Sequence, residues 1–125
     1  AQFGLAWSLE NSDKPNEAIQ HYAPLLDPKA TIDLWTVRAR FQTGECYFNM
    51  QKYEQAVKEF LNVEIQYKKY PAWQAKGILE IGRVLLAQNK REEAKQRFKD
   101  VIIRYPKEKA AIVARQYLDQ LRVNG

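Results

Sequence analysis

The chain has 125 residues, of which 46% are apolar and 28% charged, a mixture typical of one globular domain or a short repeat array rather than of a disordered segment. A single Cys and a single His exclude an intrachain disulfide and a His/Cys zinc site, and no run of about 18 apolar residues predicts a membrane span. The net charge of +5 is uneven, because residues 1–62 carry 6 Lys/Arg and 8 Asp/Glu whereas residues 63–125 carry 14 and 7.

Apolar residues spaced by three and four positions predict a succession of amphipathic helices. In chain order the predicted helices cover residues 2–11, 15–26, 32–50, 53–67, 72–88, 91–104 and 108–122. Pro24 falls inside the second of them, and since proline has no N–H to donate, we expect that helix to end or kink near Ala23. On the sixth, Glu93 precedes Arg97 by four residues, which is the spacing of a helical ion pair.

The chain matches itself when it is shifted by 38 residues. A small residue, an alanine twelve positions later and a ring four positions after that recur in three units. These residues are Ala6, Ala18 and Tyr22, then Gly44, Ala56 and Phe60, then Gly82, Ala94 and Phe98. Small residues let two helices approach closely, and the ring fills the space beside them. Each unit is therefore expected to be a pair of antiparallel helices.

These positions, with Leu9, Tyr47 and Leu85 three residues after the small residue and Pro106 near the end of the third unit, resemble the tetratricopeptide repeat (TPR). The resemblance covers essentially the whole chain. It implies an all-α fold, a right-handed α-solenoid of three TPR-like helix pairs followed by a C-terminal capping helix. The implied units are 1–30, 31–70 and 71–106, and the implied cap is 107–125.

The units depart from the usual repeat in length and at one position. The period is 38 residues rather than about 34, and the Trp usual near the start of the first helix is replaced by Arg40 and Ile78. Such stretched units, with Tyr-Pro pairs at 70–71 and 105–106, are similar to those of bacterial envelope TPR proteins of the Tol-Pal-associated and outer-membrane-assembly lipoprotein types. That similarity favours a periplasmic or outer-membrane-associated location over a cytoplasmic one. Since position 1 matches residues inside first helices, we expect a fragment of a longer chain.

The resemblance also implies a protein-binding scaffold, because the first helices of TPR units line a concave groove in which ligands lie. By family register the groove residues are Phe3, Trp7, Arg38, Phe41, Glu45, Phe48, Asn49, Lys76, Arg83 and Tyr117. Rings and arginines anchor many interfaces, so this set suits a peptide or protein partner. A ring stripe at helical spacing is equally what core packing produces, and the last helix could fill the groove near Tyr117. Both interpretations stay open here.

Two other binding modes remain as alternatives. Apolar residues at the start of the chain, such as Phe3, Leu5 and Leu9, would let an exposed edge pair with a second copy, making the chain a self-assembly module. Nucleic-acid binding would use the basic second half, if its cations form one face. Those cations are Lys68, Lys69, Lys90, Arg91, Lys95, Arg97, Lys99, Arg104, Lys107 and Lys109. No recognised nucleic-acid motif accompanies them, so this class is the less favoured.

Nothing in the sequence predicts an enzyme, a cofactor or a metal site. Cys46 lies at a packing position and His21 at an outward position of a different helix, so they form no nucleophile–base pair. The TPR clamp for peptide carboxylates is not matched either. It needs a Lys and an Arg one turn apart, whereas Lys76 is followed by Glu80.

Overall fold

The computed structural model describes residues 15–26 and 34–124, and these residues form helices joined by short connections without a strand. The predicted helix over 2–11 lies outside the described residues. The elements are α2 (Pro15–Tyr22), the short 3-10 helix η1 (Ala23–Leu26), α3 (Leu34–Asn49), α4 (Tyr53–Gln66), α5 (Pro71–Ala87), α6 (Arg91–Arg104) and α7 (Lys109–Asn124). The all-α prediction is confirmed, and the predicted boundaries of these helices agree within two residues, apart from the second.

The interruption predicted at Pro24 is present. The α-helix ends at Tyr22, and residues Ala23–Leu26 continue as the tighter 3-10 turn. Proline cannot donate the backbone hydrogen bond that an α-helix needs four residues back, so the chain leaves the α conformation just before it.

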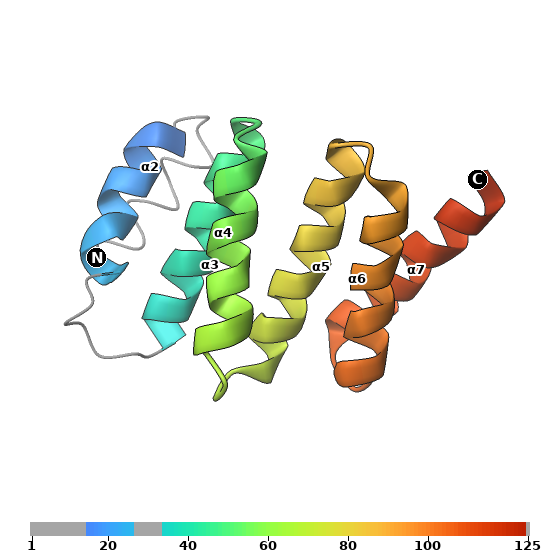
Figure 1. Ribbon diagram of the computed structural model, residues 1–125. Helices are drawn as coiled ribbons and strands as arrows, with labels where there is room; N and C mark the ends of the chain where they lie inside the picture. The colour runs from blue at the N-terminus through green and yellow to red at the C-terminus, as the bar shows by residue number, and fades with distance from the viewer. Residues whose placement is uncertain (1–14, 27–33, 125) are drawn as a thin grey trace.

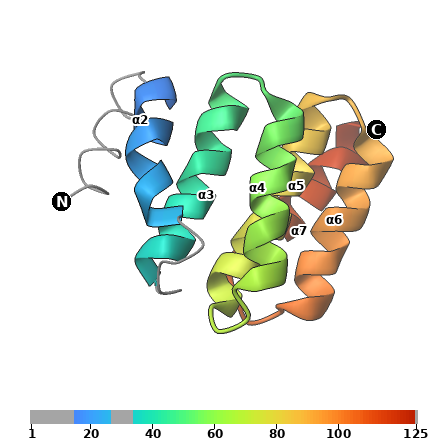
Figure 2. The same cartoon turned by 60° about the vertical axis from the view of Figure 1, so that its left-hand side comes forward.

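The helices stand side by side and alternate in direction along a row from α2 to α7 (Figures 1 and 2). Each helix packs on its neighbour in the chain. In addition α3 contacts α5 and α5 contacts α7, whereas the backbones of α4 and α6, both fully described, do not approach each other as closely and are bridged by long side chains such as Glu64 and Arg97. The row therefore curves, with α3, α5 and α7 on its inner side and α4 and α6 on its outer side. This is the arrangement of a helical repeat solenoid.

The two hairpin turns are conformational copies one period apart. Gln51 and Asn89 both adopt the left-handed backbone, with φ of 61° and 62°. The following residues, Lys52 and Lys90, then lead into α4 and α6 with φ and ψ of −90° and 73°, and of −101° and 68°. Pro71 occupies the first turn of α5, where its missing N–H costs no helical hydrogen bond.

The small residues and the rings of the repeat meet as the sequence predicts. A Cβ atom built on Gly44 would lie 2.7 Å from the Phe60 ring, and one built on Gly82 would lie 2.5 Å from the Phe98 ring. Both phenylalanines are fully buried. Only glycine therefore allows α3 to approach α4, and α5 to approach α6, this closely. In α7 the same register position holds Gln120, which is exposed, as expected of a helix that closes an array.

Arg40, one of the two residues at the usual Trp position, forms an ion pair between the helices of its unit. Its Nη1 lies 2.9 Å from Oε2 of Glu59 on α4. Burial alone would lower the pKa of Arg40, but hydrogen bonds to Glu59 and Tyr67 raise it above its usual value. The guanidinium therefore stays charged inside the hairpin.

Candidate functional site

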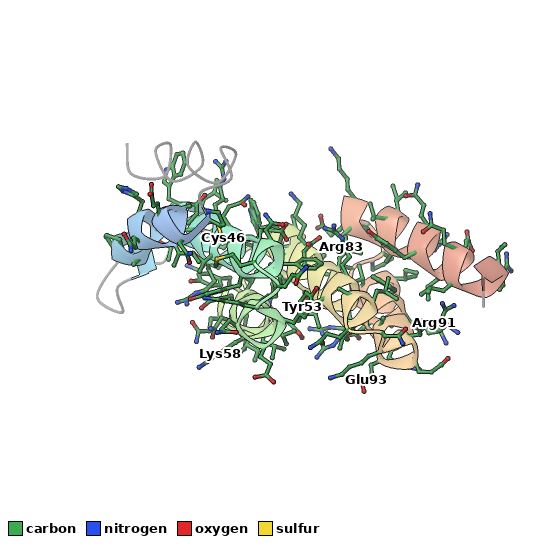
Figure 3. The ribbon with its side chains drawn as sticks, turned by 90° about the horizontal axis from the view of Figure 1, so that it is seen from above. Cys46, Tyr53, Lys58, Arg83, Arg91 and Glu93 are labelled. Atoms are coloured by element: carbon green, nitrogen blue, oxygen red, sulfur yellow. The ribbon has the colours of Figure 1, made fainter. Side chains whose placement is uncertain are left out.

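The inner side of the row is centred on Arg83 of α5. Its Nη1 donates to both carboxylate oxygens of Glu80, at 2.9 and 2.8 Å. Its guanidinium carbon lies 5.5 Å from the ring centre of Phe48 on α3. Seen from above, Arg83 lies on one side of the helices and Lys58 and Glu93 lie on the other (Figure 3).

The electrostatics of this centre keep it charged. Burial alone would lower the pKa of Arg83, but the charge and hydrogen bonds of Glu80, with smaller contributions from Tyr117 and Glu45, raise it above its usual value. These partners come from α3, α5 and α7. The arrangement fixes one guanidinium where the three inner helices meet, and it places a positive charge beside the buried carboxylate of Glu80.

Two cation–ring pairs repeat along the inner helices with the 38-residue period. The Arg38 guanidinium carbon lies 5.1 Å from the Trp35 ring centre, and Nζ of Lys76 lies 4.5 Å from the Trp73 ring centre. In each pair the cation follows the tryptophan by three residues, so both lie on one face of their helix. Each tryptophan ring therefore lies against a long cationic side chain of its own helix, in α3 and in α5.

The predicted groove rings mostly serve packing. Phe41 is buried between Phe60 and Trp73, with ring centres 5.4 and 5.3 Å away. Tyr117 stacks on Phe98 at 4.8 Å with the ring planes 3° apart. These rings therefore join neighbouring units, which is the packing interpretation that the sequence left open.

The remaining candidates divide between polar groups on the inner helices and residues that the structure does not describe. Phe48 packs edge-on against Tyr53 at 6.0 Å and is half-buried. Glu45 is half-buried and Asn49 is exposed at the end of α3. Phe3 and Trp7, like the edge expected to support self-assembly, lie outside the described residues.

Comparison with protein families identifies the repeat. A family model described as tetratricopeptide repeat matches residues 38–71 and 77–108, which together are just over half of the chain. The chain belongs to the tetratricopeptide repeat family. A search of curated proteins found no match. TPR units generally mediate protein–protein interaction, and the two matched segments contain Arg38 and Arg83, whereas Lys76 lies just before the second segment.

The basic residues of this TPR chain do not form one face. One edge of the array, formed by the α4–α5 and α6–α7 connections, carries Lys68, Lys69, Lys107 and Lys109. Lys90 and Arg91 lie at the opposite edge, where α5 is connected to α6. Others are engaged by carboxylates, as in Arg97 with Glu64, Arg104 with Glu64 and Asp100, and Lys95 with Glu92. The pairing predicted between Glu93 and Arg97 is wrong, because Glu64 of α4 holds Arg97 at 3.1 Å.

The structure also contains a feature that the sequence analysis missed. A cleft of about 640 Å³ lies on the outer side of the TPR row, with Val57, Ile81, Leu85 and Ile103 as its apolar lining and polar α6 side chains along one wall. It exists because the backbones of α4 and α6 stay apart and are joined by long side chains, as in the ion pair of Glu64 with Arg97. The spacing of apolar residues within one helix does not predict such a cleft, because the cleft depends on the angle between neighbouring units.

Other site classes find little support in the part of the chain that the structure describes. Cys46 is fully buried among Ala18, Tyr22 and Ala39. The described His, Cys, Asp and Glu side chains form no group of three or more that could hold a metal ion. Among the same residues no helix combines the length and apolar character needed to cross a bilayer.

Proposed function

We propose that the chain is a protein-interaction scaffold that binds a peptide or protein partner along the inner side formed by α3, α5 and α7. The observation that carries the proposal is the repeated cation–ring pair, Arg38 with Trp35 and Lys76 with Trp73. Two cations at equivalent positions of successive units match a partner that presents acidic groups along its length. Because their side chains are already held against rings, little conformational entropy is lost when the partner binds.

The chemistry of the inner side also narrows the partner. Glu80 is held by Arg83 and buried, so its charge does not repel an acidic segment as a free carboxylate would. The Lys–Arg clamp for a terminal carboxylate is not matched, so the proposed ligand is an internal acidic segment rather than a chain terminus. Phe41 lies in the core and Phe48 and Tyr117 pack against it, which leaves charged and polar side chains to provide much of the recognition.

We infer that the chain acts by binding and not by catalysis. Its one described thiol, Cys46, is buried in a helix interface, and its one histidine, His21, lies on α2 rather than α3. The similarity of the stretched units to bacterial envelope TPR proteins supports a periplasmic or outer-membrane location as part of the proposal. Reading the coding sequence upstream of this segment for an export signal tests that location.

Selection of phage-displayed random peptides on the purified chain tests the binding proposal. Selected peptides are then measured by fluorescence polarisation against Arg38→Ala/Lys76→Ala and against a control, Lys58→Ala/Lys99→Ala, which removes two exposed cations from α4 and α6. We expect the inner pair to weaken binding by about tenfold or more and the outer pair to leave it unchanged. Equal losses in both variants, or peptides that respond only to the outer pair, would contradict the proposal.

A further inference from the structure

Three exposed isoleucines lie at one edge of the array, at the ends of the helices and not at the α2 or α7 end of the row. Ile65 and Ile103 lie one period apart near the C-terminal ends of α4 and α6, and Ile112 lies in the first turns of α7. Their exposed fractions are 63%, 76% and 63%. Since α4 and α6 run opposite to α7, all three fall at the same end, the lower edge of Figure 1. None of them serves the core or the proposed partner-binding side.

The same end is rich in lysine. Lys68 and Lys69 lie in the connection between α4 and α5, Lys107 lies between α6 and α7, and Lys109 begins α7; all four are exposed. We call these four lysines and the three isoleucines the basic end. Of the acidic side chains nearby in the described residues, Glu64 and Asp100 are both engaged by Arg104, and Glu108 lies between Lys107 and Lys109. The cations outnumber the carboxylates here, so the local charge is positive.

The opposite end provides an internal comparison. It also carries exposed lysines, Lys52 and Lys90, at the starts of α4 and α6. The one large apolar side chain exposed there among the described residues is Val123, near the end of α7. What distinguishes the basic end is the combination of three protruding aliphatic side chains with four exposed lysines, and not positive charge alone.

That combination indicates the chemistry of the ligand. Phosphodiesters would engage the lysines but offer nothing to three isolated aliphatic side chains. An acidic protein segment would need a groove that buries all three, and the cleft between α4 and α6 is lined by Ile103 but by neither Ile65 nor Ile112. A bilayer interface accepts both groups, because aliphatic side chains enter the headgroup–acyl boundary while lysines meet headgroup phosphates.

We propose that the basic end docks the array on an anionic lipid surface. Ile65, Ile103 and Ile112 insert into the interface, and the lysines bind the phosphates around them. Such binding is peripheral and reversible and needs no spanning helix. It is independent of the inner side, so either proposal can fail without the other.

Sedimentation with vesicles of equal parts phosphatidylglycerol and phosphatidylcholine tests this docking, with vesicles of phosphatidylcholine alone as the lipid control. The test variant is Lys69→Glu/Lys107→Glu, and its matched control is Lys52→Glu/Lys90→Glu. Each pair lies one period apart, is exposed and changes the net charge of +5 by the same amount. A third variant, Ile65→Ser/Ile103→Ser, removes the apolar component at exposed positions. Circular dichroism verifies that each variant is folded.

We expect binding to anionic vesicles and none to phosphatidylcholine alone. Lys69→Glu/Lys107→Glu should weaken binding by roughly 30-fold or more, at about fivefold for each lysine lost, whereas Lys52→Glu/Lys90→Glu should change it little. Ile65→Ser/Ile103→Ser should weaken it by about tenfold. Raising the salt from about 0.1 M to about 1 M, which shortens the Debye length from about 10 Å to about 3 Å, should weaken it further.

Three results would overturn the proposal. The first is absence of binding to anionic vesicles, and the second is an equal response of the two charge-reversal variants. The third is insensitivity to Ile65→Ser/Ile103→Ser, which would mean that the end attracts anions without inserting. In each case polarisation with a labelled oligonucleotide and with polyglutamate then identifies nucleic acid or an acidic protein segment as the ligand of these lysines.

Discussion

Replacing Gly82 by alanine tests the close approach on which each helix pair depends. In an ordinary helix interior this change stabilises by about 0.8–1.0 kcal/mol, because alanine restricts the unfolded chain and suits the helix. Here the added Cβ would lie 2.5 Å from Cε1 of Phe98 and 2.9 Å from its Cδ1 and Cζ. The ring is fully buried and stacked on Tyr117, so it has little space to move.

Two opposing effects set the size of the change. Overpacking of a buried contact costs about 1–3 kcal/mol, and the helix preference returns somewhat less than 1 kcal/mol. We therefore expect Gly82→Ala to lower the free energy of unfolding by about 1 kcal/mol, with about 2 kcal/mol as the upper end. In a Phe98→Leu background the ring carbons at 2.5 Å and at the Cζ position are gone. The same Gly82→Ala change should there be neutral or stabilise by up to about 1 kcal/mol.

Urea unfolding followed by circular dichroism at 222 nm measures all four members of this double-mutant cycle. The m-values should agree, so that shifts of the midpoint report stability. Gln120→Ala, at the same register position of α7 but exposed, is the control and should stay within about 0.5 kcal/mol of the parent. A rise in the midpoint for Gly82→Ala alone, or an equal loss in both backgrounds, would refute the packing argument.

The other predictions concern ion pairs and the thiol. Glu64→Gln should cost about 1 kcal/mol at low salt, since both ion pairs to α6 are lost, and the cost should shrink in urea titrations at about 1 M salt; a salt-independent cost would contradict it. Arg83→Leu should cost about 1–3 kcal/mol by leaving the buried Glu80 carboxylate without its partner, and adding Glu80→Gln should restore much of that loss; simple additivity of the two changes would argue against the pair. Cys46 should react with a thiol reagent in urea but only very slowly in the native chain, as absorbance of the released thiolate will report, and rapid native labelling would disprove its burial.

Local rules in the sequence predicted much of the fold. The spacing of apolar residues located the described helices, and the lack of an N–H on Pro24 located the end of α2. The pairing of Gly44 with Phe60 followed from the repeat, because the same small residue and ring recur in each unit. These features depend on interactions within one helix pair, where register alone determines which side chains meet.

Interactions between units were harder to predict. Glu64 pairs with Arg97 across 33 residues, and no local spacing favours it over the nearer Glu93. The inner-side rings were ambiguous for a similar reason. From the sequence, Phe41 could point either into the groove or toward α5, the first helix of the following unit. The angle between the two units determines that its ring packs on Trp73 of α5. The bond of Arg83 to Glu80 follows the i,i+3 spacing and was available from the sequence.

The matching turns at Gln51 and Asn89 make residues 53–90 an interchangeable building block. The segment begins after Lys52 and ends at Lys90, two residues with nearly the same backbone angles. A duplicate inserted after Lys90 would thus start in the conformation that the original copy starts in. Its Phe60 would meet Gly82 as Phe98 does now. The array can consequently be lengthened by whole units, and the number of units can change without changing how each unit packs on the next.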